Sequence, residues 1–158
     1  MSCGENEQPG KKINRKNTEE SLMKANKKLV KSEDQQIEDF MERYGWKMNK
    51  TGTGLRYMIY KGGDGMRTEK GNKVSLSYSL SFLTGEVCYT SKEKGNKIFT
   101  VGQGGVEPGL EEGILFLKKG DRAKFILPSH LAFGLVGDGN KIPAKATLVY
   151  DIEVLEVK

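Results

Sequence analysis

Histidine and cysteine are scarce in this chain of 158 residues, which has one histidine, His130, and two cysteines, Cys3 and Cys88. A single histidine excludes paired catalytic histidines and histidine-based metal cages. The two cysteines have no metal-binding spacing and define no disulfide framework. Cys88 has no histidine or basic cluster beside it in sequence, so we expect a partly buried structural cysteine. We therefore expect no metal and no cofactor, and we expect His130 to be a loop residue.

Long apolar runs and concentrated charge are also missing. No apolar stretch approaches the length of a membrane span. The net charge is +5, and the excess of basic residues is spread along the chain instead of forming a patch with stacking aromatics. We expect a solvated surface of mixed charge and no nucleic-acid partner. The Gly-rich segment 102–105 lacks the Gly-Lys-Ser/Thr ending that holds a nucleotide.

The first 17 residues are polar and have nothing to bury, which predicts a disordered tether over residues 1–17. Cys3 near the start of this tail resembles the lipid-modified cysteine of a mature bacterial lipoprotein. That resemblance implies an anchor in the cell envelope, facing the periplasm or the outer surface, and it requires an apolar segment upstream. A lipid on Cys3 is the only membrane contact expected. The alternative is a cytoplasmic protein with an incidental cysteine.

Residues 18–50 are predicted to form a helical extension. Thr18 is expected as its N-cap, Ser32 as a possible restart, and Gly45 as its end. Two apolar stripes recur at helical spacing: Leu22, Ala25 and Leu29, then Ile37, Phe40, Met41 and Tyr44. The second stripe must be buried. It can pack on the rest of its own chain, pair with a second copy as a homodimer, or bind another partner.

Residues 51–158 are predicted to form a strand-rich α+β domain. The strongest signal is the stretch from Val74 to Phe82, where apolar residues alternate with serines. This period of two indicates a strand with one face on a core and one in water. Further strands are expected at 55–60, 86–90, 97–101, 123–127 and 146–157, one helix at 106–115, and a long loop at 128–140.

Five segments together carry a family resemblance: residues 45–57, 101–114, 119–125, 125–134 and 142–152. Their sequence and order resemble FKBP-type peptidyl-prolyl cis-trans isomerases, and most closely the lipoprotein isomerases of gliding-type bacteria. The resemblance implies an antiparallel half-barrel wrapped round one short helix, with an N-terminal helical extension. It also implies proline-containing polypeptides as substrates.

The resemblance implies an apolar pocket for the prolyl peptide. The matching positions are Tyr78, Tyr89, Phe99, Val106, Glu107, Leu110, Phe133, Ile142 and Tyr150. At Glu107 the implied contact is the backbone N–H, which would meet the substrate carbonyl that follows the proline.

Several pocket positions depart from the family pattern. The family's Phe-Asp pair is Cys88-Tyr89, its loop tyrosine is Phe133, and an aromatic wall position is Lys97. Leu110 replaces the usual tryptophan, and Tyr150 replaces a phenylalanine.

Two functions follow from this comparison. The first is an isomerase that assists the folding of envelope proteins, with activity reduced by the loss of the aspartate and of the tyrosine hydroxyl. On this reading, Tyr89→Asp should raise the activity or the affinity for macrolides, if the aspartate is the missing group. The second is a non-catalytic binding module or chaperone that has kept the fold.

Overall fold

The computed structural model describes residues 15–158, except for the side chains of residues 29–31. Cys3 and most of the predicted tether lie outside the described residues. The chain divides into two compact units, with the boundary between Ser32 and Glu33. The second unit therefore includes residues 33–50, which the sequence analysis assigned to the extension. In the described part, no helix is both long enough and apolar enough to cross a membrane.

One continuous helix, α1, runs from Arg15 to Tyr44. Two expectations were wrong: residues 15–17 are helical, so Thr18 is not the N-cap, and the helix does not restart at Ser32. The predicted end at Gly45 is confirmed. Gly45 has a φ of +67°, and the N–H of Trp46 donates to the carbonyl of Met41 at 2.9 Å. This left-handed residue satisfies the last carbonyls of the helix, which glycine allows at little cost.

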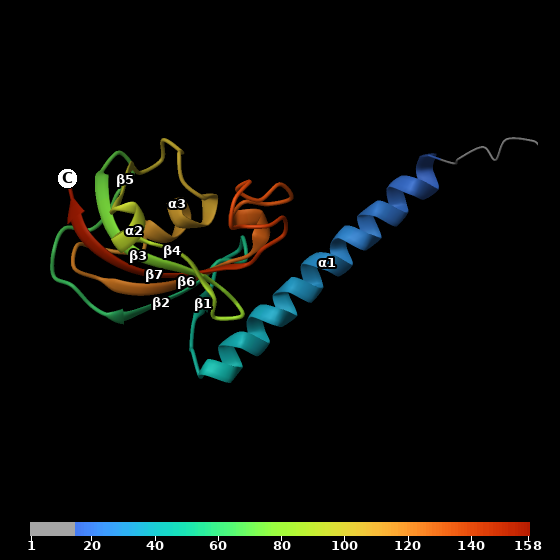
Figure 1. Ribbon diagram of the computed structural model, residues 1–158, viewed down its shortest axis with the longest axis horizontal. Helices are drawn as coiled ribbons and strands as arrows, with labels where there is room; N and C mark the ends of the chain where they lie inside the picture. Colours follow the sequence, from blue (N-terminus) through green and yellow to red (C-terminus); the bar gives the residue numbers. More distant parts are fainter. Residues whose placement is uncertain (1–14) are drawn as a thin grey trace, which may run out of the picture. The chain divides into compact units, whose positions relative to one another are not determined.

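A seven-stranded antiparallel sheet forms the second unit (Figure 1). Its strand order is β1-β2-β6-β7-β3-β4, and β5 pairs with the same edge of β3 as β4 does. The strands are β1 (Asn49–Lys50), β2 (Arg56–Lys61), β3 (Lys73–Phe82), β4 (Val87–Thr90), β5 (Lys97–Thr100), β6 (Arg122–Leu127) and β7 (Leu148–Val157). The strand predictions are confirmed within a few residues, except that the two-residue β1 was not expected.

The predicted alternation of β3 is confirmed, because Val74, Leu76 and Leu80 are buried. Their face of the sheet packs against helix α3 (Pro108–Ile114). Two glycines permit this close approach. A Cβ on Gly109 would lie 2.5 Å from Leu127, and one on Gly113 would lie 2.6 Å from the ring of Phe125. The sequence signature of α3 therefore includes glycines as well as its N-terminal proline.

The expectation of one helix in this domain was incomplete. A four-residue helix, α2 (Ser91–Lys94), separates β4 from β5, and a single 3-10 turn, η1 (Ser129–Leu131), opens the long loop. The segment of α2 was expected to be a charged loop. Its four residues are too few to show helical periodicity, which is why the sequence pattern missed it.

The apolar stripe of α1 packs on its own chain, as one of the three alternatives predicted. Ile37 and Phe40 are buried with Ile126 of β6 and Val149 of β7. Tyr44 departs from the expectation, because it is 52% exposed at the last position of the helix. Strands β6 and β7 are therefore covered on both faces where they meet residues 33–44, which explains why they carry consecutive apolar residues there.

Candidate functional site

Two adjoining hollows lie between α3, the edge strands and the long loop. The first has a volume of about 300 Å³, and the second, of about 320 Å³, shares Lys97, Glu107 and Phe133 with it. The first is also lined by Tyr78, Leu80, Tyr89 and Lys94, and the second by Gly105, Val106, Pro108 and Ala132. The structure thus brings five predicted residues to these walls: Tyr78, Tyr89, Val106, Glu107 and Phe133.

The other four predicted residues lie in the core instead of on the surface of the hollows. Leu110 and Tyr150 are fully buried, and Ile142 and Phe99 are almost so. All four belong to the same apolar cluster against which Tyr78, Tyr89, Val106 and Phe133 pack. They therefore support the walls from behind, and any direct contact with a ligand stays a prediction.

A buried polar group stands at the junction of the two hollows. The Tyr150 hydroxyl donates to Oε1 of Glu107 at 2.7 Å, and Nζ of Lys97 lies 3.5 Å from Oε2. The Lys97 ammonium also lies 5.2 Å from the centre of the Tyr78 ring. Burial and the charge of Glu107 raise the pKa of both Tyr150 and Tyr78, so both hydroxyls stay protonated at neutral pH.

Sequence reasoning missed the role of the Glu107 side chain. It assigned only the backbone N–H of this residue to the site. Two departures from the family pattern, Lys97 and Tyr150, could have indicated this role. Both place a group that can pair with a carboxylate where the family has an aromatic side chain. A buried carboxylate needs such partners, so the three positions form one group.

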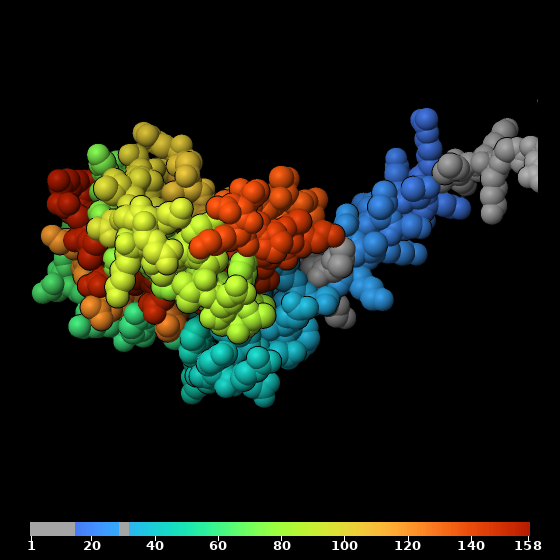
Figure 2. Space-filling view, in the orientation of Figure 1, coloured from blue at the N-terminus to red at the C-terminus, as the bar shows by residue number. Residues whose placement is uncertain are grey.

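A second polar pair joins β4 to the long loop. The Tyr89 hydroxyl donates to Oδ2 of Asp138 at 2.5 Å, and the other oxygen of Asp138 accepts the N–H groups of Asn140 and Ile142, both at 2.8 Å. Burial opposes ionisation of Asp138, but these hydrogen bonds outweigh it and lower its pKa. Figure 2 shows the loop of residues 128–147, in orange, beside the yellow-green segment that contains Tyr89.

This pair changes the interpretation of the two missing polar contacts. A hydroxyl and a carboxylate are both present at this side of the hollow, with the hydroxyl on β4 and the carboxylate on the loop. From the sequence both groups were expected to be absent, because each position was compared with the family pattern separately. Asp138 lies in the loop segment Gly137–Gly139, where spacing alone does not indicate a partner for Tyr89.

In the Gly-rich segment before α3, backbone N–H groups are hydrogen-bonded to a side chain of the same protein. The N–H groups of Gly102 and Gly104 donate to the carboxylate of Glu111 at 2.7 and 2.9 Å. These donors, which could face a phosphate in other proteins, are therefore occupied. The observation agrees with the sequence argument against a nucleotide site.

Cys88 and His130 carry side chains that are reactive in other proteins, but here both make structural contacts. Cys88 is 3% exposed, its thiol donates to the carbonyl of Leu80 at 3.2 Å, and burial raises its pKa. His130 lies in η1 and pairs with the carbonyl of Thr53 at 2.7 Å. Within residues 15–158, no three histidine, cysteine or carboxylate side chains are grouped so that they could hold a metal ion.

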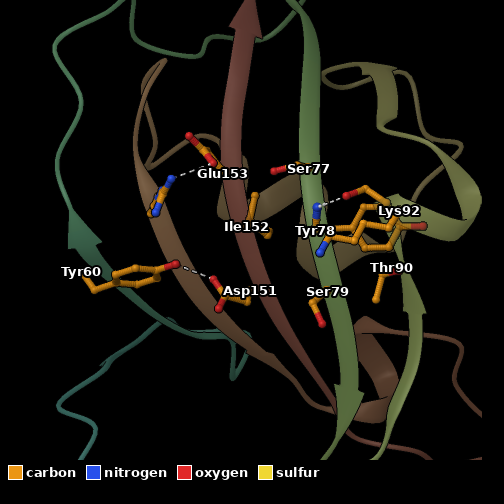
Figure 3. Close-up of a pocket in the computed structure, with 11 residues that line it drawn as sticks. Tyr60, Ser77, Tyr78, Ser79, Thr90, Lys92, Asp151, Ile152 and Glu153 are labelled. Carbon is orange, nitrogen blue, oxygen red and sulfur yellow. Dashed lines mark hydrogen bonds and ion pairs between the residues drawn. The ribbon is translucent and has the colours of Figure 1, made fainter.

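A larger hollow, of about 700 Å³, lies across β2, β6, β7 and β3 (Figure 3). Most of its lining residues carry polar or charged groups, among them Ser77, Ser79, Thr90 and the ion pair of Arg122 with Glu153 at 3.2 Å. Tyr78 is the one predicted site residue among its lining. We name this region the outer groove, because its β7 residues, Asp151 and Glu153, alternate with the buried residues of the same strand.

Comparison with known proteins agrees with this architecture. The sequence profile of the FKBP-type peptidyl-prolyl cis-trans isomerases matches residues 65–155. The chain is 38% identical over 108 residues to a probable FKBP-type peptidyl-prolyl cis-trans isomerase, FkpA, of Neisseria meningitidis, a match that covers 68% of this chain and 39% of that protein. It is 36% identical over 107 residues to FK506-binding protein 1A of Neurospora crassa, covering 66% and 89% of the two chains.

Among solved structures, FkpA from Escherichia coli is similar, with a TM-score of 0.68 and 27% identity. That similarity covers 93% of this chain and 74% of the other. It therefore extends beyond the isomerase domain into the N-terminal helical extension. The chain spans well under half the length of the curated Neisseria relative.

Proposed function

This chain belongs to the FKBP-type peptidyl-prolyl cis-trans isomerase family, and we propose that it catalyses cis–trans isomerisation of X–Pro bonds in polypeptides. The observation that carries the proposal is the pair of adjoining hollows. Their walls combine Tyr78, Tyr89, Val106 and Phe133 with a carboxylate, Glu107, that is already paired inside the protein. Such a site offers an apolar surface without a nucleophile.

Isomerisation needs no nucleophile, because no covalent bond breaks. The barrier of about 18–20 kcal/mol arises from the loss of amide resonance when the C–N bond twists. The twisted amide is less dipolar than the planar one, so an apolar wall favours it. Lowering the barrier by about 4 kcal/mol accelerates the reaction about a thousandfold. In this proposal the aromatic side chains supply the wall, and the backbone N–H of Glu107 holds the chain beyond the proline.

A proline-limited refolding assay tests this function. The full chain at micromolar concentration should accelerate the slow phase of a substrate protein whose refolding waits on an X–Pro bond. A matched peptide assay should show preference for an apolar residue before the proline. An unchanged slow phase, with the peptide assay also at the uncatalysed rate, would exclude the enzyme.

The second candidate function is that of a binding module or chaperone. One observation favours it: Leu135 and Val136, next to each other in the long loop, are 75% and 85% exposed. Exposed apolar side chains of this kind can hold unfolded chains. Suppressed aggregation of a proline-free client, without isomerase activity, would favour this function over the first.

We also propose that the chain works in the cell envelope on folding proteins. The support is the sequence of the polar tail with Cys3 and the likeness to lipoprotein isomerases. A diacyl-modified cysteine with a further amide-linked chain would anchor a domain of this size stably, at about 0.8 kcal/mol per buried CH₂. Expressed from its native gene, the wild type should enter the detergent phase, whereas Cys3→Ser should be released. Equal fractionation of the two would exclude the anchor.

A homodimer through the N-terminal helix is a further proposal. In the first unit Leu22 and Met23 are 59% and 63% exposed. Pairing with a second copy would bury them. Sedimentation equilibrium should then show a dimer that Leu22→Lys shifts to monomer, and a monomer at all concentrations would exclude it.

A further inference from the structure

The loop of residues 128–147 supplies several parts of the candidate site. It carries Phe133 in the wall, Asp138 beside Tyr89, and Ile142 in the core behind the hollow. A loop of this length needs internal support to keep a fixed shape. Part of that support is local, because the N–H of Lys145 donates to the carbonyl of Gly134 at 2.8 Å.

Both ends of this loop are fastened to one carboxylate, that of Glu33 in α1. Oε1 of Glu33 accepts the backbone N–H of Ser129 at 2.6 Å and the hydroxyl of Thr147 at 2.6 Å. Oε2 accepts the hydroxyl of Ser129 at 2.9 Å. Ser129 follows the start of the loop and Thr147 is its last residue, so a single side chain joins its two ends.

The contacts of Glu33 lie outside the sheet, so the hydrogen bonds between β6 and β7 do not already hold these residues. The pairing of β6 with β7 ends at Leu127 and Leu148. Glu33 acts just beyond this last pair, where the two chain segments leave the ladder. Hydrogen bonds to an ionised carboxylate are shorter and stronger than neutral ones, so they fix the directions in which the loop departs.

We propose that Glu33 is a positioning residue for the isomerase reaction, and that it acts through the loop by holding Phe133 in the wall of the hollow. The proposal rests on the proposed function. Glu33 itself does not line either hollow. Its role is to hold the loop in the conformation that places Phe133 in the wall of the hollow. The substrate then does not have to order the loop when it binds.

The next residue of the same helix provides a matched control. The carboxylate of Asp34 binds Nη2 of Arg56 at 2.7 Å and Nζ of Lys50 at 2.8 Å. Arg56 is fully buried in β2. Asp34 thus makes ionic contacts of similar length from the same helical turn, but to strands β1 and β2 and not to the loop. Loss of stability alone would affect both variants, whereas loss of loop position would affect only one.

The experiment compares Glu33→Ala, Glu33→Gln and Asp34→Ala in the full chain. We expect Glu33→Ala to lower kcat/KM about fivefold, with KM raised, because ordering the loop then competes with substrate binding. Glu33→Gln should retain at least about half of the activity, since its amide oxygen can accept both bonds made by Oε1. Asp34→Ala should leave kcat/KM unchanged while it lowers the unfolding midpoint.

Hydrogen exchange gives a readout that does not depend on activity. The amide of Lys145 should exchange faster in Glu33→Ala than in Asp34→Ala under native conditions. If Glu33→Ala does not fold, Thr147→Val replaces it, with about a twofold loss of kcat/KM expected from the loss of one of three bonds.

The outcomes separate this proposal from the proposed function. An inactive wild type would overturn the isomerase function itself. An active wild type, with Glu33→Ala or its substitute keeping full kcat/KM and normal exchange of Lys145, would overturn the positioning role alone. Equal losses of activity in the Glu33 and Asp34 variants would overturn it as well, because the effect would then follow stability.

Discussion

Two hydrogen bonds between a tyrosine and a carboxylate lie on opposite faces of the sheet. Tyr150 donates to Glu107 at 2.7 Å, and Tyr60 donates to Asp151 at 2.6 Å. Tyr150 and Asp151 are consecutive in β7, so their side chains point to opposite faces. The first pair is buried beneath the hollows, whereas Tyr60 is 47% exposed and Asp151 43% exposed in the outer groove.

The comparison shows that bond length alone does not tell what a polar contact contributes. Water can replace either partner in the outer groove, so the exposed bond adds little net free energy. Water cannot easily reach Glu107, and losing its donor leaves a desolvated carboxylate. The buried pair also lies at the junction of the two hollows, where Lys97 and Glu107 interrupt the apolar wall. We therefore expect Lys97, Glu107 and Tyr150 to affect both stability and function.

The largest expected effect comes from Tyr150→Phe. Removing the hydroxyl leaves Oε1 of Glu107 without its donor, and the free energy of unfolding should fall by about 1.5–3 kcal/mol. Urea denaturation measures the change. The double variant Tyr150→Phe with Glu107→Ile should recover part of the loss, because the buried carboxylate is then gone, while the partly exposed Lys97 ammonium loses its partner. A single variant as stable as wild type would contradict the view that this pair is structurally important.

A smaller effect is expected at Tyr89, where the contact with Asp138 leads us to predict the opposite of the expectation from sequence. Tyr89→Asp would place a second carboxylate beside Asp138, and like charges repel. We expect kcat/KM to fall several-fold instead of rising. Tyr89→Asp combined with Asp138→Asn should restore activity, since it removes the repulsion. Higher activity in the single variant would show that the family's aspartate is the missing group after all.

The smallest effect is expected from Tyr60→Phe in the outer groove, within about 0.5 kcal/mol of wild type at neutral pH. Burial and then the hydrogen bond to Asp151 raise the pKa of Tyr60 to about 12. The protonated Tyr60 therefore contributes its full stabilisation below about pH 10, the pKa of tyrosine in the unfolded chain. This contribution is lost as the pH rises to about 12. Wild type should lose more stability than Tyr60→Phe across this range in urea titrations. Parallel curves would contradict the raised pKa.

Local patterns in the sequence predicted most of the sheet. The alternation from Val74 to Phe82 depends only on the two-residue period of a strand, so it could be recognised without tertiary information. The Gly-rich turn and Pro108 located the start of α3, because they too are local signals that need no tertiary information. The short elements β1 and α2 were missed because two to four residues do not establish a period.

The contacts that complete the site could not be predicted, because they join residues far apart in sequence. Tyr89 meets Asp138, and Glu33 meets both Ser129 and Thr147. Each of these side chains is also common on solvated surfaces, so its type alone carries no signal. Only the folded sheet, which brings the loop ends and α1 to one place, gives them partners.

The central claim is that the hollows beside α3 perform the isomerisation and the outer groove does not. NMR exchange spectroscopy on a short proline peptide measures the interconversion directly, with wild type, Phe133→Ala and Ser77→Ala compared at equal concentration. Phe133→Ala removes an aromatic wall and should lower kcat/KM at least about tenfold, while Ser77→Ala should match wild type. Full activity in Phe133→Ala, or an equal loss in Ser77→Ala, would contradict the claim.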